Sequence, residues 1–331
     1  MKLRRLGLAM VLAASLLTVS FGGEAQQPKT ISRIGFLASS SLQGEGMKRR
    51  LAAFQQGLRE LGYMEGRNIV IEYRSAEGNF TRLPELAAEL VRLQVDVIVA
   101  EGTPAAHAAK TATTVIPVVI GNAGDPVGSG LVASLARPSG NITGLSDFAS
   151  GAAVKRLQLL REMVPSASRV AVLLNPSNST NPLQLKEISD AAPAVDVTLL
   201  ALAAKGPEDI DRAFTTIRRE RPGGLIVLGD PMFGTHRRRI VEQAVKSRIP
   251  AIYGAEEWVD AGGLMGYGVN FPDLYRRAST YVDKILKGTK PAELPVEQPT
   301  KLELIINVKT ARQLGLTIPQ SILYRVDRVI Q

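Results

Sequence analysis

The feature that most constrains the fold of this chain is a duplication, in which two halves repeat one order of apolar runs. In the first half, RIGFLASS (33–40) and VDVIVAEGTP (95–104) are short apolar runs that end in small polar residues. In the second half, RVAVLLNP (169–176) and GLIVLGDP (224–231) repeat this pattern. Such runs, rich in β-branched residues, are typical of strands buried on both faces of a parallel sheet. An internal repeat of domain size predicts two similar α/β lobes.

Helix patterns separate these runs. The spacing of apolar side chains and the helix-start residues predict helices over 47–61, 81–93, 127–135, 154–163, 183–192, 208–219, 239–247 and 272–286. Strands that alternate with helices favour right-handed βαβ units. The predicted fold class is therefore α/β, with two Rossmann-like lobes that each contain a parallel sheet.

The C-terminal tail does not follow the repeat. After the helix pattern over 272–286 comes a proline-rich stretch and then a strand pattern, KLELIINV (301–308). We expect this tail to cross back between the lobes and to supply hinge strands. The predicted organisation is a first lobe over 30–145 and about 272–298, and a second lobe over 146–271 and about 299–331.

Residues 1–25 have the character of a targeting segment. Lys2, Arg4 and Arg5 precede an apolar stretch over 6–21, and a site with small residues ends at Ala25. This order is typical of a cleavable secretory signal peptide. The alternative is an uncleaved membrane anchor, but the apolar run is short for a membrane span.

The chain contains no cysteine, which excludes disulfides, thiolate metal sites and thiol nucleophiles. It also excludes the lipid-modified cysteine that tethers many exported bacterial proteins, so we expect a freely soluble periplasmic protein. The formal net charge is +9, but the basic residues are interspersed with acidic ones. The densest basic run, Arg237–Arg239, opens a predicted helix and favours a solvated helix face over a nucleic-acid patch. We expect no nucleic-acid partner.

Motifs for enzyme chemistry are missing from the sequence. No G-x-G-x-x-G follows the first strand pattern, and neither a phosphate loop nor a G-x-S-x-G nucleophile elbow is present. The two histidines, His107 and His236, stand at non-corresponding positions of two predicted helices. Asp125 and Asp230, at strand ends in different halves, remain the best acid–base pair. A hydrolase or isomerase that uses them is an alternative, but we expect no catalytic residues, no metal and no cofactor.

A ligand-binding interpretation uses the polar strand ends better. In open parallel sheets, ligands bind at the carboxyl ends of the strands, where helix N-termini favour anions. Each residue at these positions has a structural alternative, since caps and turns need the same side chains. The candidate ligand-binding residues are Ser39, Ser40, Thr103, Asp125, Asn175, Asp230 and Tyr253. Such convergent polar groups with an aromatic wall suit a small zwitterion or carboxylate.

Several framework segments resemble one known family. They are VDVIVA with GTP (95–104), GDPVG (124–128), LARP with GNITG (135–144), DKILKG (283–288) and LPVEQPTK (294–301). The chain resembles the ABC-transporter substrate-binding proteins whose better-known members bind tryptophan and other aromatic amino acids. The resemblance implies a type I periplasmic-binding fold, with two lobes that are joined by three crossovers and close on ligand. It also implies a pocket at the strand ends of both lobes, which the seven candidate residues match by position.

The sequence thus predicts the periplasmic solute-binding component of an ABC importer, which presents its closed form to a permease in the inner membrane. We expect a monomer that binds an amino acid or a related carboxylate and performs no chemistry. The chain is only 5% aromatic, which disfavours an aromatic ligand. A periplasmic sensor subunit for a receptor is an alternative with the same pocket.

Overall fold

Two separate sheets form the framework of the computed structural model, which describes residues 31–147 and 149–331. The predicted signal peptide over 1–25 lies outside the described residues. The five-stranded sheet has the order β2-β1-β3-β4-β5 and is parallel throughout. Its strands are β1 (Ser32–Ala38), β2 (Ile69–Ser75), β3 (Val97–Glu101), β4 (Val118–Asn122) and β5 (Ile142–Gly144).

The seven-stranded sheet has the order β12-β11-β10-β9-β8-β6-β7 and is parallel except at the β10–β11 pair. Its strands are β6 (Arg169–Leu174), β7 (Thr198–Ala203), β8 (Gly224–Val227), β9 (Ala251–Tyr253), β10 (Met265–Gly268), β11 (Glu303–Asn307) and β12 (Arg328–Ile330). The predicted α/β class, with a parallel sheet in each half, is therefore confirmed.

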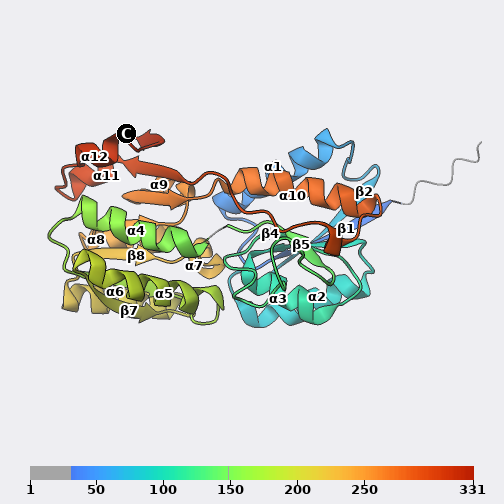
Figure 1. Cartoon of the computed structure of the whole chain (residues 1–331), viewed down its shortest axis with the longest axis horizontal. Helices are drawn as coiled ribbons and strands as arrows, with labels where there is room; N and C mark the ends of the chain where they lie inside the picture. Colours follow the sequence, from blue (N-terminus) through green and yellow to red (C-terminus); the bar gives the residue numbers. More distant parts are fainter. Residues whose placement is uncertain (1–30, 148) are drawn as a thin grey trace, which may run out of the picture. The chain divides into compact units, whose positions relative to one another are not determined.

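Helices cover both faces of the five-stranded sheet (Figure 1). One face packs against α1 (Glu45–Glu60) and α10 (Phe271–Leu286), and the other against α2 (Leu83–Arg92) and α3 (Gly102–Ala112). Short 3₁₀ turns lie at η1 (Phe80–Arg82) and η3 (Pro291–Glu293). Strand residues alternate between the two cores, so that Phe36 joins the α1 side and Leu37 the α2 side.

The seven-stranded sheet is covered in the same way. One core contains residues of α4 (Ala149–Met163), α5 (Thr180–Ala191), η2 (Ala192–Val195), α11 (Val308–Gln313) and α12 (Gln320–Leu323). The other contains residues of α6 (Pro207–Glu220), α7 (Pro231–Thr235), α8 (Arg237–Lys246) and α9 (Glu256–Asp260). Among the described helices, none combines the length and the apolar character that a bilayer crossing requires.

We call each sheet with its covering helices a lobe, the first built on β1–β5 and the second on β6–β12. The tail contributes to both, since α10 packs against α1 and β11 pairs with β10. Beside β5, the backbone N–H of Ser146 donates to the carbonyl of Glu297 at 2.8 Å. From these contacts we infer that 30–145 and about 272–298 form the first lobe, and that 146–271 and about 299–331 form the second. The exact boundaries between these segments stay a proposal.

The helix predicted over 127–135 is wrong. In its place, Asp125 and Pro126 begin a series of turns, with Ser129 N–H donating to the carbonyl of Asp125 at 2.9 Å. Gly130 has a φ of +75°, which lies outside the right-handed helical region, so a helix cannot continue through it. The loop therefore remains irregular at the carboxyl end of β4.

Candidate ligand-binding site

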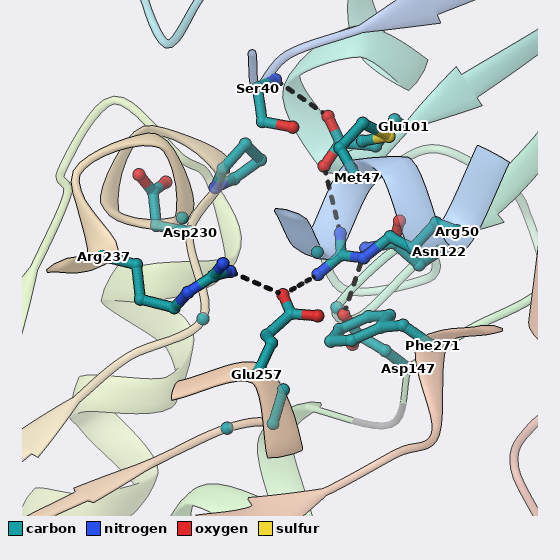
Figure 2. A pocket seen from close by; sticks show the side chains of 18 of the residues that line it. Ser40, Met47, Arg50, Glu101, Asn122, Asp147, Asp230, Arg237, Glu257 and Phe271 are labelled. Atoms are coloured by element: carbon teal, nitrogen blue, oxygen red, sulfur yellow. Dashed lines mark hydrogen bonds and ion pairs between the residues drawn. The ribbon is translucent and has the colours of Figure 1, made fainter. Parts of the chain in front are cut away.

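A cavity of about 90 Å³ lies between the two lobes, large enough for several water molecules. First-lobe residues from the carboxyl ends of β1, β3 and β4 line one side, among them Ser40, Glu101 and Asn122. Second-lobe residues that follow β8 and β9, among them Asp230 and Gly254, line the other side. Because parallel strands end at the same edge of each sheet, these groups converge on one place (Figure 2).

An acid–base cluster from both lobes forms part of the cavity wall, with side chains at most 11% exposed. Arg50 of α1 points between Glu101 and Glu257 (Figure 2). Its Nη1 lies 3.5 Å from Oε1 of Glu101, and its Nη2 pairs with Glu257. Nη1 of Arg237 lies 3.5 Å from Oε1 of the same Glu257. The cluster therefore joins α1 of the first lobe to α8 and α9 of the second.

Burial dominates the electrostatics of this cluster. Desolvation raises the pKa of Glu101, although the charge of Arg50 and the backbone N–H groups of Ser39 and Ser40 oppose the shift. These N–H groups donate to Oε2 of Glu101 at 2.8 and 2.9 Å. Desolvation alone would lower the pKa of Arg50, but the combined attraction of Glu257, Tyr275 and Glu101 outweighs it, and the pKa is raised. Attraction between the opposite charges of the cluster therefore opposes the desolvation of Glu101 and of Arg50.

Arg156 of α4 is a third buried cation at the cavity, with an exposure of 4%. Its Nε donates to the carbonyl of Tyr267 at 2.8 Å. Burial lowers the pKa of Arg156 to about 10, against the opposing charge of Asp147. Its Nη1 has no hydrogen-bond partner within the part of the chain that the structure describes. A buried guanidinium with an open N–H group is suited to bind a carboxylate.

Asp230 is a further acidic group of the second lobe at the cavity, besides Glu257. Its carboxylate caps α7 by accepting from the N–H groups of Met232 at 3.0 Å and Phe233 at 3.3 Å. It also accepts from Nδ2 of Asn175 at 3.2 Å and of Asn178 at 3.0 Å. Burial raises the pKa of Asp230 to about 6 in spite of these four donors. Asp230 therefore has the capping role that is the structural alternative to ligand binding.

This raised pKa predicts a pH dependence of stability. The folded-state pKa lies above the 3.8 of an unperturbed aspartate, so the folded protein binds more protons between these values. The stabilisation is present below pH ~4 and is lost as the pH rises through about 6. Relative to Asp230→Asn, the free energy of unfolding of the wild type should rise by about 1 kcal/mol between pH 7 and pH 5. Denaturant titrations of both proteins measure this difference, and equal changes in both would contradict it.

Three of the candidate residues line the cavity, namely Ser40, Thr103 and Asp230. Thr103 does not cap its helix as predicted, since α3 begins at Gly102 and Glu101 holds the cap position. Its hydroxyl instead accepts from the N–H of Gly124 at 3.2 Å and so joins the ends of β3 and β4. Whether these three side chains contact a ligand stays a prediction.

The other four candidates do not line the cavity. Ser39 is buried, and its hydroxyl donates to the carbonyl of Glu101 at 2.8 Å. Asn175 is buried beside Asp230 and supports it through the hydrogen bond described above. Asp125 accepts from the N–H groups of Val127 and Gly128 at 3.2 and 2.8 Å, which is a turn-capping role.

Tyr253 stacks on Trp258, with ring centroids 4.9 Å apart, and it is Trp258 that lines the cavity. The ring of Tyr253 belongs to the core under α9 because alternate residues of a strand point to opposite faces.

The acid pair of the enzyme alternative, Asp125 and Asp230, is not brought together at this cavity. Asp125 does not line the cavity with Asp230, and neither His107 nor His236 lines it. Instead, Nε2 of His107 lies 3.4 Å from the hydroxyl of Ser179 across the two lobes.

Sequence reasoning missed the acid–base cluster. Arg50 lies on the same helix face as the buried Met47, Phe54 and Leu58, and a charge on an apolar face was the signal available. The prediction that the run Arg237–Arg239 is a solvated helix face is wrong for Arg237, because that side chain is only 9% exposed and pairs with Glu257. Its two neighbours in the run are exposed.

Glycines of the first lobe allow the second lobe to approach closely. A Cβ atom on Gly124 would lie 2.8 Å from Cγ2 of Thr180, and one on Gly102 would lie 2.8 Å from Cγ of Pro231. An ion pair at 2.6 Å between Arg49 and Asp260 also joins the lobes. The two lobes therefore lie against each other beside the cavity in this structure.

Three proteins provide the main comparisons. The chain is 28% identical to the tyrosine-binding protein of Clostridioides difficile over 263 residues, which covers 80% of this chain and 75% of the relative. A structure of the ABC domain in complex with L-Trp from Streptococcus pneumoniae superimposes with a TM-score of 0.82 and 28% identity, covering 90% of this chain and all of that one. A conserved domain protein from Vibrio cholerae gives a TM-score of 0.85 at 27% identity, covering 91% and 100%.

These similarities, together with the two parallel sheets, confirm the predicted type I periplasmic-binding fold. The profile of the family described as ABC transporter substrate binding protein matches residues 38–330, which is nearly all of the described chain. A cavity between two lobes is a common place for a small-molecule binding site. The chain belongs to the family of ABC transporter substrate-binding proteins.

Proposed function

We propose that this protein is the periplasmic solute-binding component of an ABC importer and that it captures a small amino acid or related carboxylate between its lobes. The main support for a carboxylate ligand is Arg156, which is a buried cation at the cavity with an open N–H group. A ligand carboxylate would satisfy that group with a charge-assisted hydrogen bond. Asp230 and Gln184, which also line the cavity, offer acceptors for an ammonium group.

The comparisons support the same ligand class. One relative carries the name tyrosine-binding protein, and another was crystallised with L-Trp, so both names associate this fold with amino acids. Export by a cleaved signal peptide, the periplasmic location and the absence of a lipid anchor remain parts of the proposal. The same holds for the monomeric state and for the inner-membrane permease as transient partner.

Capture by closure follows from the geometry of the lobes. The cavity wall contains contacts between lobes, such as the Arg50–Glu257 pair, that form only when the lobes meet. A ligand that touches both walls therefore stabilises the closed form over the open one. The closed form is the state that we expect a permease to recognise.

A thermal-shift screen of amino acids and small carboxylates tests this function. A ligand present at about 100 times its Kd should add roughly 2.7 kcal/mol of stability and raise the melting temperature. After incubation with the protein, the bound solute should be recovered chemically intact. A screen in which no carboxylate raises the melting temperature would contradict the proposal, and a solute recovered as a different compound would favour an enzyme.

A further inference from the structure

The aromatic side chains at the cavity already use ring faces for contacts within the protein. The guanidinium carbon of Arg50 lies 4.0 Å from the ring centroid of Phe271, in a cation–π contact. Trp258 stacks on Tyr253 with an interplanar angle of 11°. Phe271 and Trp258 are the aromatic residues among those that line the cavity in the described part of the chain. A ligand ring therefore does not find an open aromatic sandwich.

Charged side chains form part of the remaining wall. The acid–base cluster of Arg50, Glu101, Glu257 and Arg237 lines the cavity with side chains that are nearly excluded from solvent. An aromatic ring packed against such groups would displace water and return no hydrogen bond, which costs free energy. A hydroxyl, amide or carboxylate group would replace the lost water contacts.

Open hydrogen-bonding atoms also point to an oxygen-rich ligand. Several buried polar atoms of residues that line the cavity have no hydrogen-bond partner among the described residues. The donors are Arg156 Nη1, Arg50 Nε and Arg237 Nε, and the acceptor is Gln184 Oε1. These donors come from α1, α4 and α8, so more than one acceptor group on the ligand is needed to satisfy them. A buried donor left unsatisfied costs about 1–3 kcal/mol, which favours ligands that supply those acceptors.

We infer that the cavity selects a small carboxylate with a second oxygen-bearing group, such as an acidic, amide or hydroxyl amino acid or a hydroxy- or dicarboxylic acid, over the aromatic amino acids. The volume of about 90 Å³ agrees with a compact solute. This inference rests on the proposed function and specifies its substrate class.

A competition between two ligand panels tests the inference with the purified wild-type protein. The polar panel contains L-aspartate, L-glutamate, L-asparagine, L-serine, L-malate and succinate, and the aromatic panel contains L-tyrosine, L-tryptophan and L-phenylalanine. Calorimetry gives each Kd, and fluorescence of Trp258, the only tryptophan of the chain, reports binding of the non-fluorescent ligands at the cavity itself.

We expect the tightest polar ligand to bind at least 10-fold more tightly than the tightest aromatic one. An aromatic amino acid that binds as tightly as the best polar ligand, or more tightly, would overturn the inference and leave the proposed function standing. If no member of either panel binds, both the inference and the proposed amino-acid or carboxylate ligand are overturned.

Discussion

Replacing Arg156 by methionine should reduce the affinity for the solute by roughly 30-fold to several thousand-fold, because the loss of one partner of a buried charged hydrogen bond costs about 2–5 kcal/mol. Methionine keeps an unbranched apolar stem like that of arginine and removes the charged guanidinium. Relief of the desolvated guanidinium, whose pKa burial lowers to about 10, should offset the loss of its hydrogen bond to the carbonyl of Tyr267, so the unliganded melting temperature should change little. Affinity and stability should therefore move independently.

Arg161→Met is the matched control for this variant. Arg161 lies on the same helix, α4, and its Nε donates to the carbonyl of Val195 at 3.1 Å, away from the cavity. Calorimetry of the two variants and the wild type, with thermal melts of each without ligand, gives both quantities. If Arg156→Met binds the solute as tightly as Arg161→Met does, Arg156 is not the carboxylate site.

Replacing Gly124 by alanine should weaken binding by about 5- to 100-fold, since overpacking costs about 1–3 kcal/mol. The three nearest atoms to the added Cβ all belong to Thr180 of the second lobe, at 2.8 to 3.0 Å. The clash arises only when the lobes meet, so it destabilises the closed form. It does not change the stability of the form in which the lobes are separated. The unliganded melting temperature should change little.

Gly44→Ala is the control for this second variant. Gly44 also lines the cavity, but a Cβ there meets only the carbonyl oxygen of Ser41, at an ordinary 3.5 Å. Its φ of −66° is one that alanine adopts freely. Equal affinities of the two variants for the solute would mean that the closed form does not require the Gly124–Thr180 approach.

Local sequence patterns predict most of the strands and helices of the fold. The runs RIGFL and GLIVL form β1 and β8 because burial on both faces selects continuous apolar strands. The helix that the sequence predicts beyond Asp125 does not form, since Gly130 has a φ of +75°, outside the right-handed helical region. The short elements α12 and β12 near the C-terminus carry little pattern and were not predicted.

The site was harder to predict than the fold. Strand-end position identifies Ser40, Thr103 and Asp230, because the carboxyl edge of a parallel sheet collects such residues. The pairing of Arg50 with Glu257 joins residues 207 positions apart, and no local pattern encodes it. The capping motif at Asp125 predicts a binding residue, but its carboxylate caps a turn outside the cavity. A motif gives the local role of a side chain, whereas the approach of the two lobes decides which side chains face the solute.

Small-angle scattering of the wild-type protein, with and without the solute that gives the largest thermal shift, tests most directly whether the lobes capture a ligand between them. We expect a smaller radius of gyration with the solute bound, and Gly124→Ala should need a higher solute concentration to reach that smaller radius. Identical scattering curves at concentrations where calorimetry shows saturation would contradict capture by closure.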